Sequence, residues 1–180
     1  MRILRWVLVP MVVVPFVVLL TAGFGHDPRA IPSRLIGKPM PAFRLVAMDG
    51  RTLTDADLRG KPAIIHFWAS WCPSCVDEQS VLLDAEGRYG GRVTIVGVIY
   101  QDTVDRARAW EARYGTGSWP DLLDPAGGLA IDFGVTGPPE SYFVDANGIV
   151  RDKQFGPITA SALDAKLGPL IAGAGGGSGG

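Results

Sequence analysis

The pattern of hydrophobic and polar positions separates an apolar first segment from a region of alternating strands and helices. Residues 6–25 carry no formal charge and are nearly all apolar. As a helix rising about 1.5 Å per residue, this run reaches about 30 Å, the thickness of a bilayer's hydrocarbon core. We therefore predict a transmembrane signal anchor over residues 1–25. A cleaved signal peptide is the alternative, with Arg2 and Arg5 preceding the apolar run, although the run is long for one and no clear cleavage site follows.

A proline-rich linker and then a folded domain are predicted after this segment. Residues 26–37 are typical of an extended linker, and residues 38–171 of the domain. The run Ala63–Ala69 (AIIHFWA) is continuously apolar and aromatic, as expected for a central strand covered on both faces. Further strands are predicted at 41–48, 92–100, 122–123, 141–144 and 149–155, and helical segments at 52–59, 76–89, 103–114, 129–133 and 159–171.

This order of elements predicts an α/β domain with a mixed central sheet and helices on both of its faces. The last strands, Ser141–Val144 and Ile149–Phe155, are separated by Asp145-Ala146-Asn147-Gly148, a hairpin signal. Residues 172–180 are all Gly, Ala or Ser and mostly Gly, which predicts a flexible tail.

Composition narrows the classes of function. The chain has 180 residues and a formal net charge of −1, so it offers no basic excess for a nucleic-acid partner. Its two cysteines, Cys72 and Cys75, are too few for a framework of structural disulfides. A tetrahedral zinc site needs four ligands, and the sequence adds only His26 and His66. We expect neither a metal nor a cofactor.

The segment Cys72-Pro73-Ser74-Cys75 is a C-x-x-C motif between a predicted strand and a predicted helix, which indicates a thioredoxin-like redox site. We expect Cys72 to be exposed at the helix start, where free N–H groups and the helix dipole lower its pKa. Pro73 suits a first helical turn, and Cys75 should lie one turn further in and more buried. The thiolate of Cys72 would attack a substrate disulfide, and Cys75 would then release the substrate.

Two segments carry a resemblance to a known family. The run FWASWCPSC (67–75) resembles the active-site strand and turn of the thioredoxin superfamily. The run GVTGPPESYFVDANGIV (134–150) resembles the segment that holds that superfamily's cis-proline. Its pattern G-V-x-G-x-P-E, followed by an apolar strand and D-x-N-G, is similar to the DsbE/CcmG family, the membrane-tethered thioredoxins of cytochrome c maturation. The resemblance extends from about Leu35 to Leu167 and implies a thioredoxin-like fold and a thiol:disulfide oxidoreductase.

The resemblance also implies roles for residues outside the C-x-x-C motif. Pro139 would be the cis-proline, preceded here by Pro138, which lacks the N–H with which a substrate strand could pair. Glu140 matches an acidic residue near the dithiol, where a carboxylate opposes thiolate formation; the alternative is an ordinary exposed glutamate. Glu78 matches a second acidic position, or else complements the helix dipole. The residues expected to border the substrate are Trp71, Pro73, Ser74 and Pro138.

Three aromatic or titratable residues lie in or beside the active-site strand and motif. His66 lies at the strand position where many thioredoxins keep a buried acid that relays protons. It would be either such a relay or a hydrogen-bonded core histidine. Trp68 is expected in the core, whereas Trp71 is expected to cover the dithiol and meet the partner.

The implied function is that of a membrane-anchored, extracytoplasmic disulfide reductase. Its client would be apocytochrome c or a heme-maturation relay protein, and its electron donor a membrane thiol transporter. The implied location is the bacterial inner membrane with the domain on the periplasmic side; it rests on the resemblance, because the flanking charges alone do not fix an orientation. The alternatives are a reductase for another client such as copper-site assembly, a peroxiredoxin-like peroxidase, and a copper carrier using His66. Ala69 stands where peroxiredoxins place a threonine.

Overall fold

The computed structural model describes residues 11, 13–16, 18 and 33–175. The chain divides into two units, residues 1–32 and 33–180. In the first unit, the described residues 11, 13–16 and 18 are helical. Over the part of the chain that is described, no helix combines the length and the apolar character needed to cross a bilayer. Most of the predicted anchor at 1–25 and of the linker at 26–37 lies outside the described residues.

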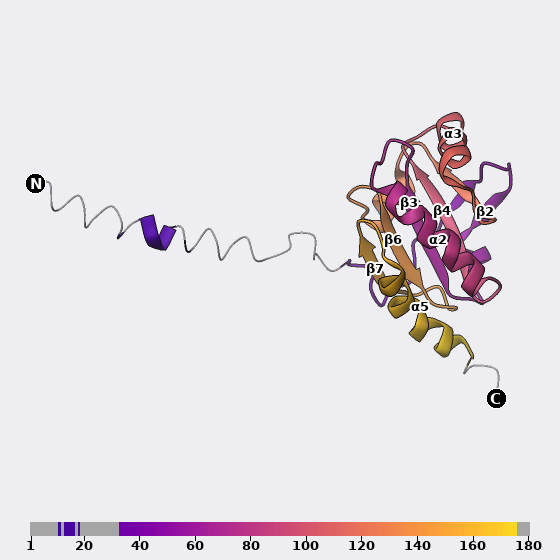
Figure 1. Ribbon diagram of the computed structural model, residues 1–180. Coiled ribbons are helices and arrows are strands. Elements are labelled where there is room, and N and C mark those ends of the chain that lie inside the picture. Colours follow the sequence, from indigo (N-terminus) through magenta and orange to yellow (C-terminus); the bar gives the residue numbers. More distant parts are fainter. Residues whose placement is uncertain (1–10, 12, 17, 19–32, 176–180) are drawn as a thin grey trace, which may run out of the picture. The chain divides into compact units, whose positions relative to one another are not determined.

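The second unit is built on a five-stranded sheet in the order β5-β4-β3-β6-β7 (Figure 1). The central strand β3 (Ala63–Trp68) pairs in parallel with β4 (Thr94–Tyr100), which pairs in parallel with β5 (Asp121–Asp124). On its other side β3 pairs antiparallel with β6 (Glu140–Val144), which forms a hairpin with β7 (Val150–Phe155). The mixed sheet that the order of elements predicts is therefore confirmed.

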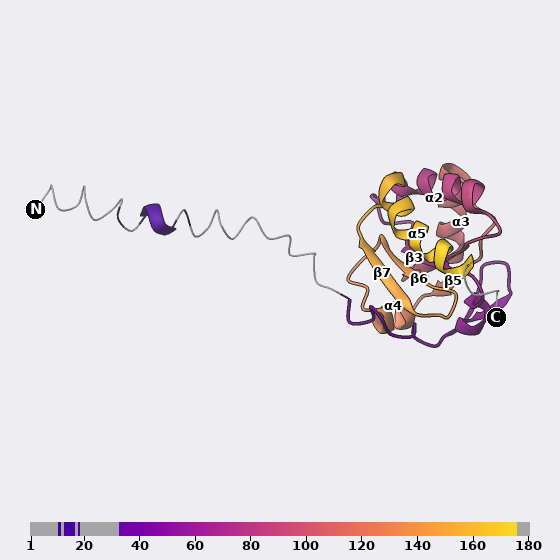
Figure 2. The ribbon, with the colours of Figure 1, turned by 90° about the horizontal axis from the view of Figure 1, so that it is seen from below.

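Helices cover both faces of this sheet (Figure 2). One face carries α2 (Cys75–Tyr89), α3 (Val104–Tyr114) and α5 (Ala160–Gly175), and Figure 2 shows these three on the same side. The opposite face carries α4 (Gly128–Phe133), the 3₁₀ helix η1 (Asp55–Leu58) and the small hairpin of β1 (Arg44–Val46) and β2 (Thr52–Thr54). The fold is thus the predicted α/β arrangement.

The strict alternation of side chains along β3 explains how one strand serves two cores. Ala63, Ile65 and Phe67 are fully buried in the cluster on the α4 face. Ile64 and Trp68 are buried in the clusters under α2, α3 and α5. A strand enclosed on both faces needs apolar residues at nearly every position, which is the physical origin of the run AIIHFWA.

Several boundaries differ from those predicted by the sequence. Thr52–Thr54 forms the strand β2 and not a helical turn, because it pairs with Arg44–Val46 to form a hairpin. Residues 34–37 form a turn, and the N–H of Gly37 donates to the carbonyl of Val150 at 2.8 Å, so the folded unit begins before the predicted residue 38. Helix α5 continues past Ile171 to Gly175, inside the segment predicted as a tail.

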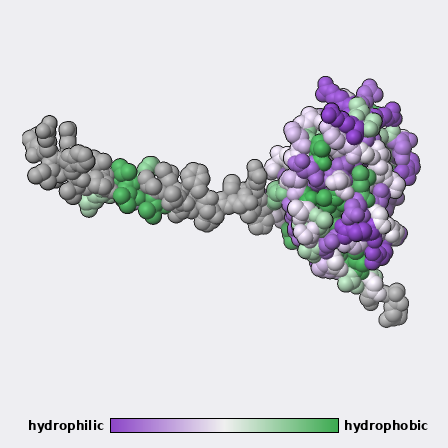
Figure 3. All heavy atoms as spheres, viewed as in Figure 1, coloured by the Kyte–Doolittle hydropathy of each residue, from purple (hydrophilic) through white to green (hydrophobic). Residues whose placement is uncertain are grey.

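The surface of the folded unit is mixed. On the face seen in Figure 3, hydrophobic residues form small areas separated by polar ones. The large apolar side chains that are exposed in this unit are Ile36, Val46, Trp71 and Ile131. Trp71 stands out among them because it is the neighbour of Cys72.

Candidate active site

The two cysteines form a disulfide in the structure. Their Cα atoms are 5.4 Å apart and their sulfur atoms are bonded at 2.11 Å. The motif leaves the carboxyl end of β3 as a turn, and α2 begins only at Cys75, with Ser74 as its N-cap residue. Cys72 therefore lies before the helix, not within it. Its Sγ still accepts the N–H of Cys75 at 3.1 Å, although this N–H at the helix start also donates to the carbonyl of Cys72 at 3.3 Å.

The predicted exposure of Cys72 is wrong for this disulfide form. Only 3% of the residue's surface is accessible, compared with 1% for Cys75. The reason is packing that the local sequence does not show: both cysteines belong to a cluster with Trp68 on β3 and Trp110 on α3. In this form, the neighbouring residues therefore leave little of Cys72 accessible to a substrate disulfide.

The expected substrate-bordering residues around the motif differ in exposure. Trp71 is 50% exposed, and its Nε1 donates to the carbonyl of Gln101 at 3.3 Å while its ring packs near that of Tyr100. Pro73 is exposed, and Ser74 is half-buried with its Oγ 3.7 Å from Sγ of Cys72. The indole of Trp71 is thus held in place while much of it remains available to a partner.

The peptide bond between Pro138 and Pro139 is cis, as the resemblance implies. Pro139 is buried and Pro138 half-buried, directly before β6. Because β3 and β6 are antiparallel, the start of β6 lies beside the end of β3, with Glu140 paired to Phe67. The cis-proline loop and the C-x-x-C turn therefore leave the sheet at the same edge.

Glu140 is a buried ion-pair residue and not an exposed glutamate. Its carboxylate accepts the N–H and the hydroxyl of Thr136 at 3.0 and 2.6 Å, and it pairs with Nζ of Lys153 at 2.6 Å. Both charged side chains are almost completely buried. The Lys153 ammonium also donates to the carbonyl of Gly134 at 3.1 Å. These contacts fix the loop that ends in the cis-proline.

Glu78 is also buried, on the first turn of α2. Its Oε2 accepts the N–H of Ile158 at 2.9 Å, and its Oε1 lies 3.5 Å from Nε2 of His66. Burial raises the pKa of Glu78 to about 8, and the nearby charge of Asp77 acts in the same direction. The carboxyl group is therefore largely protonated at neutral pH, which a residue placed only to complement the helix dipole would not be.

His66 is a hydrogen-bonded core residue in this structure. Its Nδ1 lies 3.1 Å from Oγ of Ser141, its Nε2 faces Glu78, and burial lowers its pKa to about 3. The alternation along β6 places Ser141 under α2 and the adjacent Glu140 on the α4 face. The two acids implied by the resemblance thus lie on opposite faces of the sheet.

Sequence reasoning did not find Lys153, Ser141 or Asp121 as partners of buried polar groups. The only hint of a buried role for Lys153 is that it is a charged residue within a predicted strand. In the structure it pairs in register with the buried Tyr142. Asp121 accepts Nε1–H of Trp68 at 2.7 Å, yet nothing near either residue in the sequence indicates this pair. Such contacts depend on strand register and cannot be inferred from neighbouring residues.

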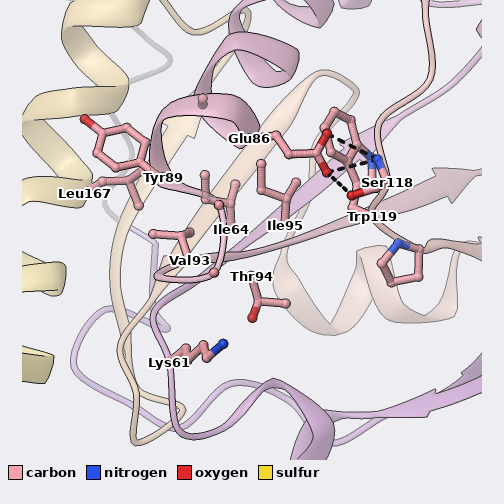
Figure 4. Close-up of a pocket in the computed structure, with 14 residues that line it drawn as sticks. Lys61, Ile64, Glu86, Tyr89, Val93, Thr94, Ile95, Ser118, Trp119 and Leu167 are labelled. Atoms are coloured by element: carbon pink, nitrogen blue, oxygen red, sulfur yellow. Dashed lines mark hydrogen bonds between the residues drawn. The ribbon is translucent and has the colours of Figure 1, made fainter.

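A separate cavity of about 310 Å³ lies away from the dithiol (Figure 4). It is lined by residues near the amino ends of β3 and β4, including Ile64 and Ile95, and by Leu167 of α5. At one side Glu86 accepts the N–H and hydroxyl of Ser118, as Figure 4 shows. Since the cysteines follow the carboxyl end of β3, this cavity is not part of the redox site.

Comparison with known proteins agrees with this geometry. The profile described as AhpC/TSA family matches residues 36–153. The thiol:disulfide interchange protein DsbE of Pseudomonas fluorescens biotype C is 44% identical over 159 residues, covering 86% of both chains. The chain belongs to the DsbE family. DsbE of Escherichia coli K12 is 36% identical, covering 81% of this chain and 79% of its own length.

Further relatives support the same family and fold. HelX of Rhodobacter capsulatus, another thiol:disulfide interchange protein, is 38% identical and covers 82% of this chain and 84% of its own. The solved structure of MTB DsbF has a TM-score of 0.67 at 33% identity, covering 71% of this chain and 94% of that one. This DsbE-family chain is therefore a thiol:disulfide oxidoreductase with a thioredoxin-like fold, and its Cys72 and Cys75 are joined by a disulfide in the structure.

Proposed function

We propose that this DsbE-family protein is a membrane-anchored, extracytoplasmic reductase that serves c-type cytochrome biogenesis. Its client is apocytochrome c or a heme-maturation partner whose cysteines must be reduced before heme attachment. The observation that carries the proposal is the combination of the Cys72–Cys75 pair with a cis-Pro139 in the segment GVTGPPE. The apolar residues 6–25 support the anchor, and a membrane thiol transporter is the proposed electron donor.

The geometry supports a two-step exchange at the dithiol. In the reduced protein, the Cys72 thiolate attacks one sulfur of the client disulfide, so a mixed disulfide forms and one client thiolate leaves. Cys75 then loses its proton and attacks Sγ of Cys72, which re-forms the Cys72–Cys75 bond and releases the second client thiolate. The N–H of Cys75, which contacts Sγ of Cys72 at 3.1 Å, stabilises the thiolate that starts the cycle.

A peroxidase is the second candidate, because the AhpC/TSA profile covers residues 36–153. Peroxide reduction requires polar groups that align the peroxide with the thiolate, and the residue three positions before Cys72 is the buried Ala69. Peroxide consumption in a thiol-coupled assay distinguishes the two candidates. A rate no higher than that of the Cys72→Ser variant would exclude the peroxidase.

Trapping of clients tests the proposed function directly. In the Cys75→Ala variant the mixed disulfide on Cys72 cannot resolve, so clients accumulate as covalent complexes. We expect apocytochromes c or heme-maturation proteins among the captured proteins, and none with Cys72→Ala/Cys75→Ala as the matched control. Capture of copper-site proteins instead, with normal c-type cytochromes in a deletion strain, would replace the proposed client while leaving the chemistry intact.

A further inference from the structure

A second pair of acids, one buried and one half-buried, lies on the face of the sheet covered by α3. Asp121 at the start of β5 is 6% exposed, and it lines one small cavity together with Glu111 on α3. Two carboxylates confined to such a space repel each other, whereas a proton on one of them lets it donate to the other. Burial raises the pKa of both groups, which favours one proton shared by the pair, and the exchange cycle described above does not use this proton.

A glycine in β4 leaves space for the carboxyl group of Asp121. Gly97 of β4 is the register partner of both His66 on β3 and Asp121 on β5, so the three residues form one row across the sheet. A Cβ at position 97 would lie only 1.8 Å from Oδ1 of Asp121. The glycine thus gives the carboxyl group the space that a side chain of β4 would otherwise fill.

A small cavity adjoins the pair. It offers about 10 Å³ to the centre of a water molecule and is lined by His66, Gln79, Glu111 and Asp121 together with three tryptophans. This is the room that one water requires, and the lining supplies polar partners for it. Gln79 lies one turn after Cys75 on α2, so the cavity reaches the helix that begins with Cys75.

Two tryptophans connect the pair to the sulfur atoms. Nε1 of Trp68 donates to Oδ1 of Asp121 at 2.7 Å, and the indole packs on that of Trp110, with ring centroids 4.7 Å apart. Trp110 immediately precedes Glu111 on α3. Both indoles belong to the buried cluster that contains Cys72 and Cys75. Asp121 thus holds Trp68, which packs against Trp110 in the cluster that contains the disulfide.

The other charged or titratable groups around Asp121 do not replace the shared proton. On β3, burial keeps His66 neutral by lowering its pKa to about 3. On α3, Arg108 attracts the charge of Glu111, yet burial still raises the pKa of Glu111. The side chains of Trp68 and Trp119 donate to Asp121, but burial and the neighbouring Glu111 raise its pKa to about 7. The pair consequently loses its proton within the physiological range of pH.

We propose that the Asp121–Glu111 pair is a proton-dependent positioning site, whose shared proton sets how readily the Cys72–Cys75 disulfide is reduced. With the proton present, the pair has one negative charge fewer, and it holds Trp68 and α3 against the cysteines. When the proton leaves, the added charge behind the dithiol disfavours the Cys72 thiolate that reduction creates. The inference rests on the thiol–disulfide chemistry and not on the identity of the client.

The test compares variants that keep the hydrogen bonds but need no proton. In Glu111→Gln and in Asp121→Asn an amide N–H can donate to the remaining carboxylate, and the amide oxygen of the second variant still accepts from Trp68. The equilibrium constant for reduction by glutathione is measured from pH 5.5 to 8.5 on the full chain. Dividing each variant's constant by that of the wild type removes the pH dependence that the thiols themselves contribute.

We expect the ratio of the variant's constant to that of the wild type to be near one at pH 5.5. At pH 8.5 it should favour the reduced form by about 3- to 10-fold, because this is the scale of the effect of one charge acting through protein. Asp105→Asn, which removes a charge from the same helix outside the acid pair, is the matched control and should stay near one throughout. Flat ratios for both amide variants, or the same rise in the control, would overturn the proposal. If Asp121→Asn does not fold, Glu111→Gln alone decides, because its side chain is only half-buried.

Discussion

Nε2 of His66 lies 3.5 Å from Oε1 of Glu78 in the core between β3 and α2. This distance is at the outer limit of a hydrogen bond, and both side chains are almost fully buried. Because burial raises the pKa of Glu78 to about 8 and lowers that of His66 to about 3, both groups are neutral at pH 6. The contact is thus a polar pair and not a salt bridge over most of the physiological range.

The pH dependence of stability follows from the raised pKa of Glu78. The folded state binds this proton more tightly than the unfolded state, so stability is lost as the pH rises from about 4.5 to about 8. Glu78→Gln keeps an acceptor for the N–H of Ile158 but does not ionise. Between pH 5 and pH 8 we expect the variant to gain about 2–4 kcal/mol in unfolding free energy relative to the wild type.

Urea unfolding at pH 5, 6, 7 and 8 measures this difference. Asp132→Asn is the control, because it removes a carboxylate that is exposed and not buried. A separation between the wild type and Glu78→Gln that does not change with pH would contradict the assignment of a raised pKa.

The ion pair between Glu140 and Lys153 yields a prediction about stability. Lys153→Met removes the ammonium and leaves the carboxylate buried with only Thr136 as donor. Loss of one partner from a buried pair costs about 3–5 kcal/mol, because the other charge is left unpaired. Thermal or urea unfolding of the variant measures the loss. Adding Glu140→Gln should restore part of it, and no recovery would argue against an electrostatic cause.

Lys166→Met provides the matched comparison. Lys166 pairs with Asp152 at 2.9 Å, but both side chains are partly exposed. Exposed pairs contribute about 0–1 kcal/mol, so this substitution should cost much less than Lys153→Met. Equal losses in the two variants would mean that the lost packing of the lysine stem, and not the buried charge, dominates.

Gly97→Ala tests the space that the glycine leaves for Asp121. The new Cβ would lie 1.8 Å from Oδ1 of Asp121 and 2.9 Å from Nε1 of Trp68, so we expect a loss of about 3 kcal/mol in unfolding free energy. The loss should be smaller in an Asp121→Ala background, where the obstructing carboxyl group is absent. Gly87→Ala, with no atom near its new Cβ in α2, should instead stabilise by about 0.5–1 kcal/mol.

Trp71 is expected to act in client binding and not in the exchange chemistry. It is 50% exposed beside Cys72, so Trp71→Ala should leave the unfolding midpoint nearly unchanged. We expect the rate of reduction to fall about tenfold for a protein client, because an exposed aromatic anchor is lost. The rate with a small aliphatic disulfide should change by less than about twofold in the same assay, since it needs no such anchor. Equal effects on both substrates would place Trp71 in the chemistry.

The sequence predicts those features that depend on local pattern. The apolar run in β3, the helix ending at Tyr89 and the hairpin of β6 and β7 follow from periodicity and turn residues, and the structure contains all three. The strand β2 could not be found in this way, because three residues give no periodic signal and are extended only through pairing with β1. Periodicity says nothing about such pairing between separate segments.

In the active site, too, some features can be predicted from the sequence and others depend on packing between distant segments. The motif itself identifies Cys72 and Cys75, and the resemblance identifies Pro139, whose cis bond the structure contains. The burial of Cys72 could not be predicted, because it arises from Trp110 on a helix more than thirty positions away. The roles of Glu140 and Glu78 in the reaction stay predictions, although their buried surroundings are now described.

The alternation of Glu140 and Ser141 in β6 has a consequence for folding specificity. These adjacent residues supply one buried polar contact on each face of the sheet, to Lys153 on one side and to His66 on the other. A slip of β6 by one position would turn every side chain of the strand to the opposite face. Both contacts would then be broken at once, and the buried charges of Glu140 and Lys153 would be left unpaired. Tyr142 adds a third contact, because its buried hydroxyl donates to the carbonyl of Phe133. These polar contacts distinguish the native alignment of the strand from one shifted by a single position.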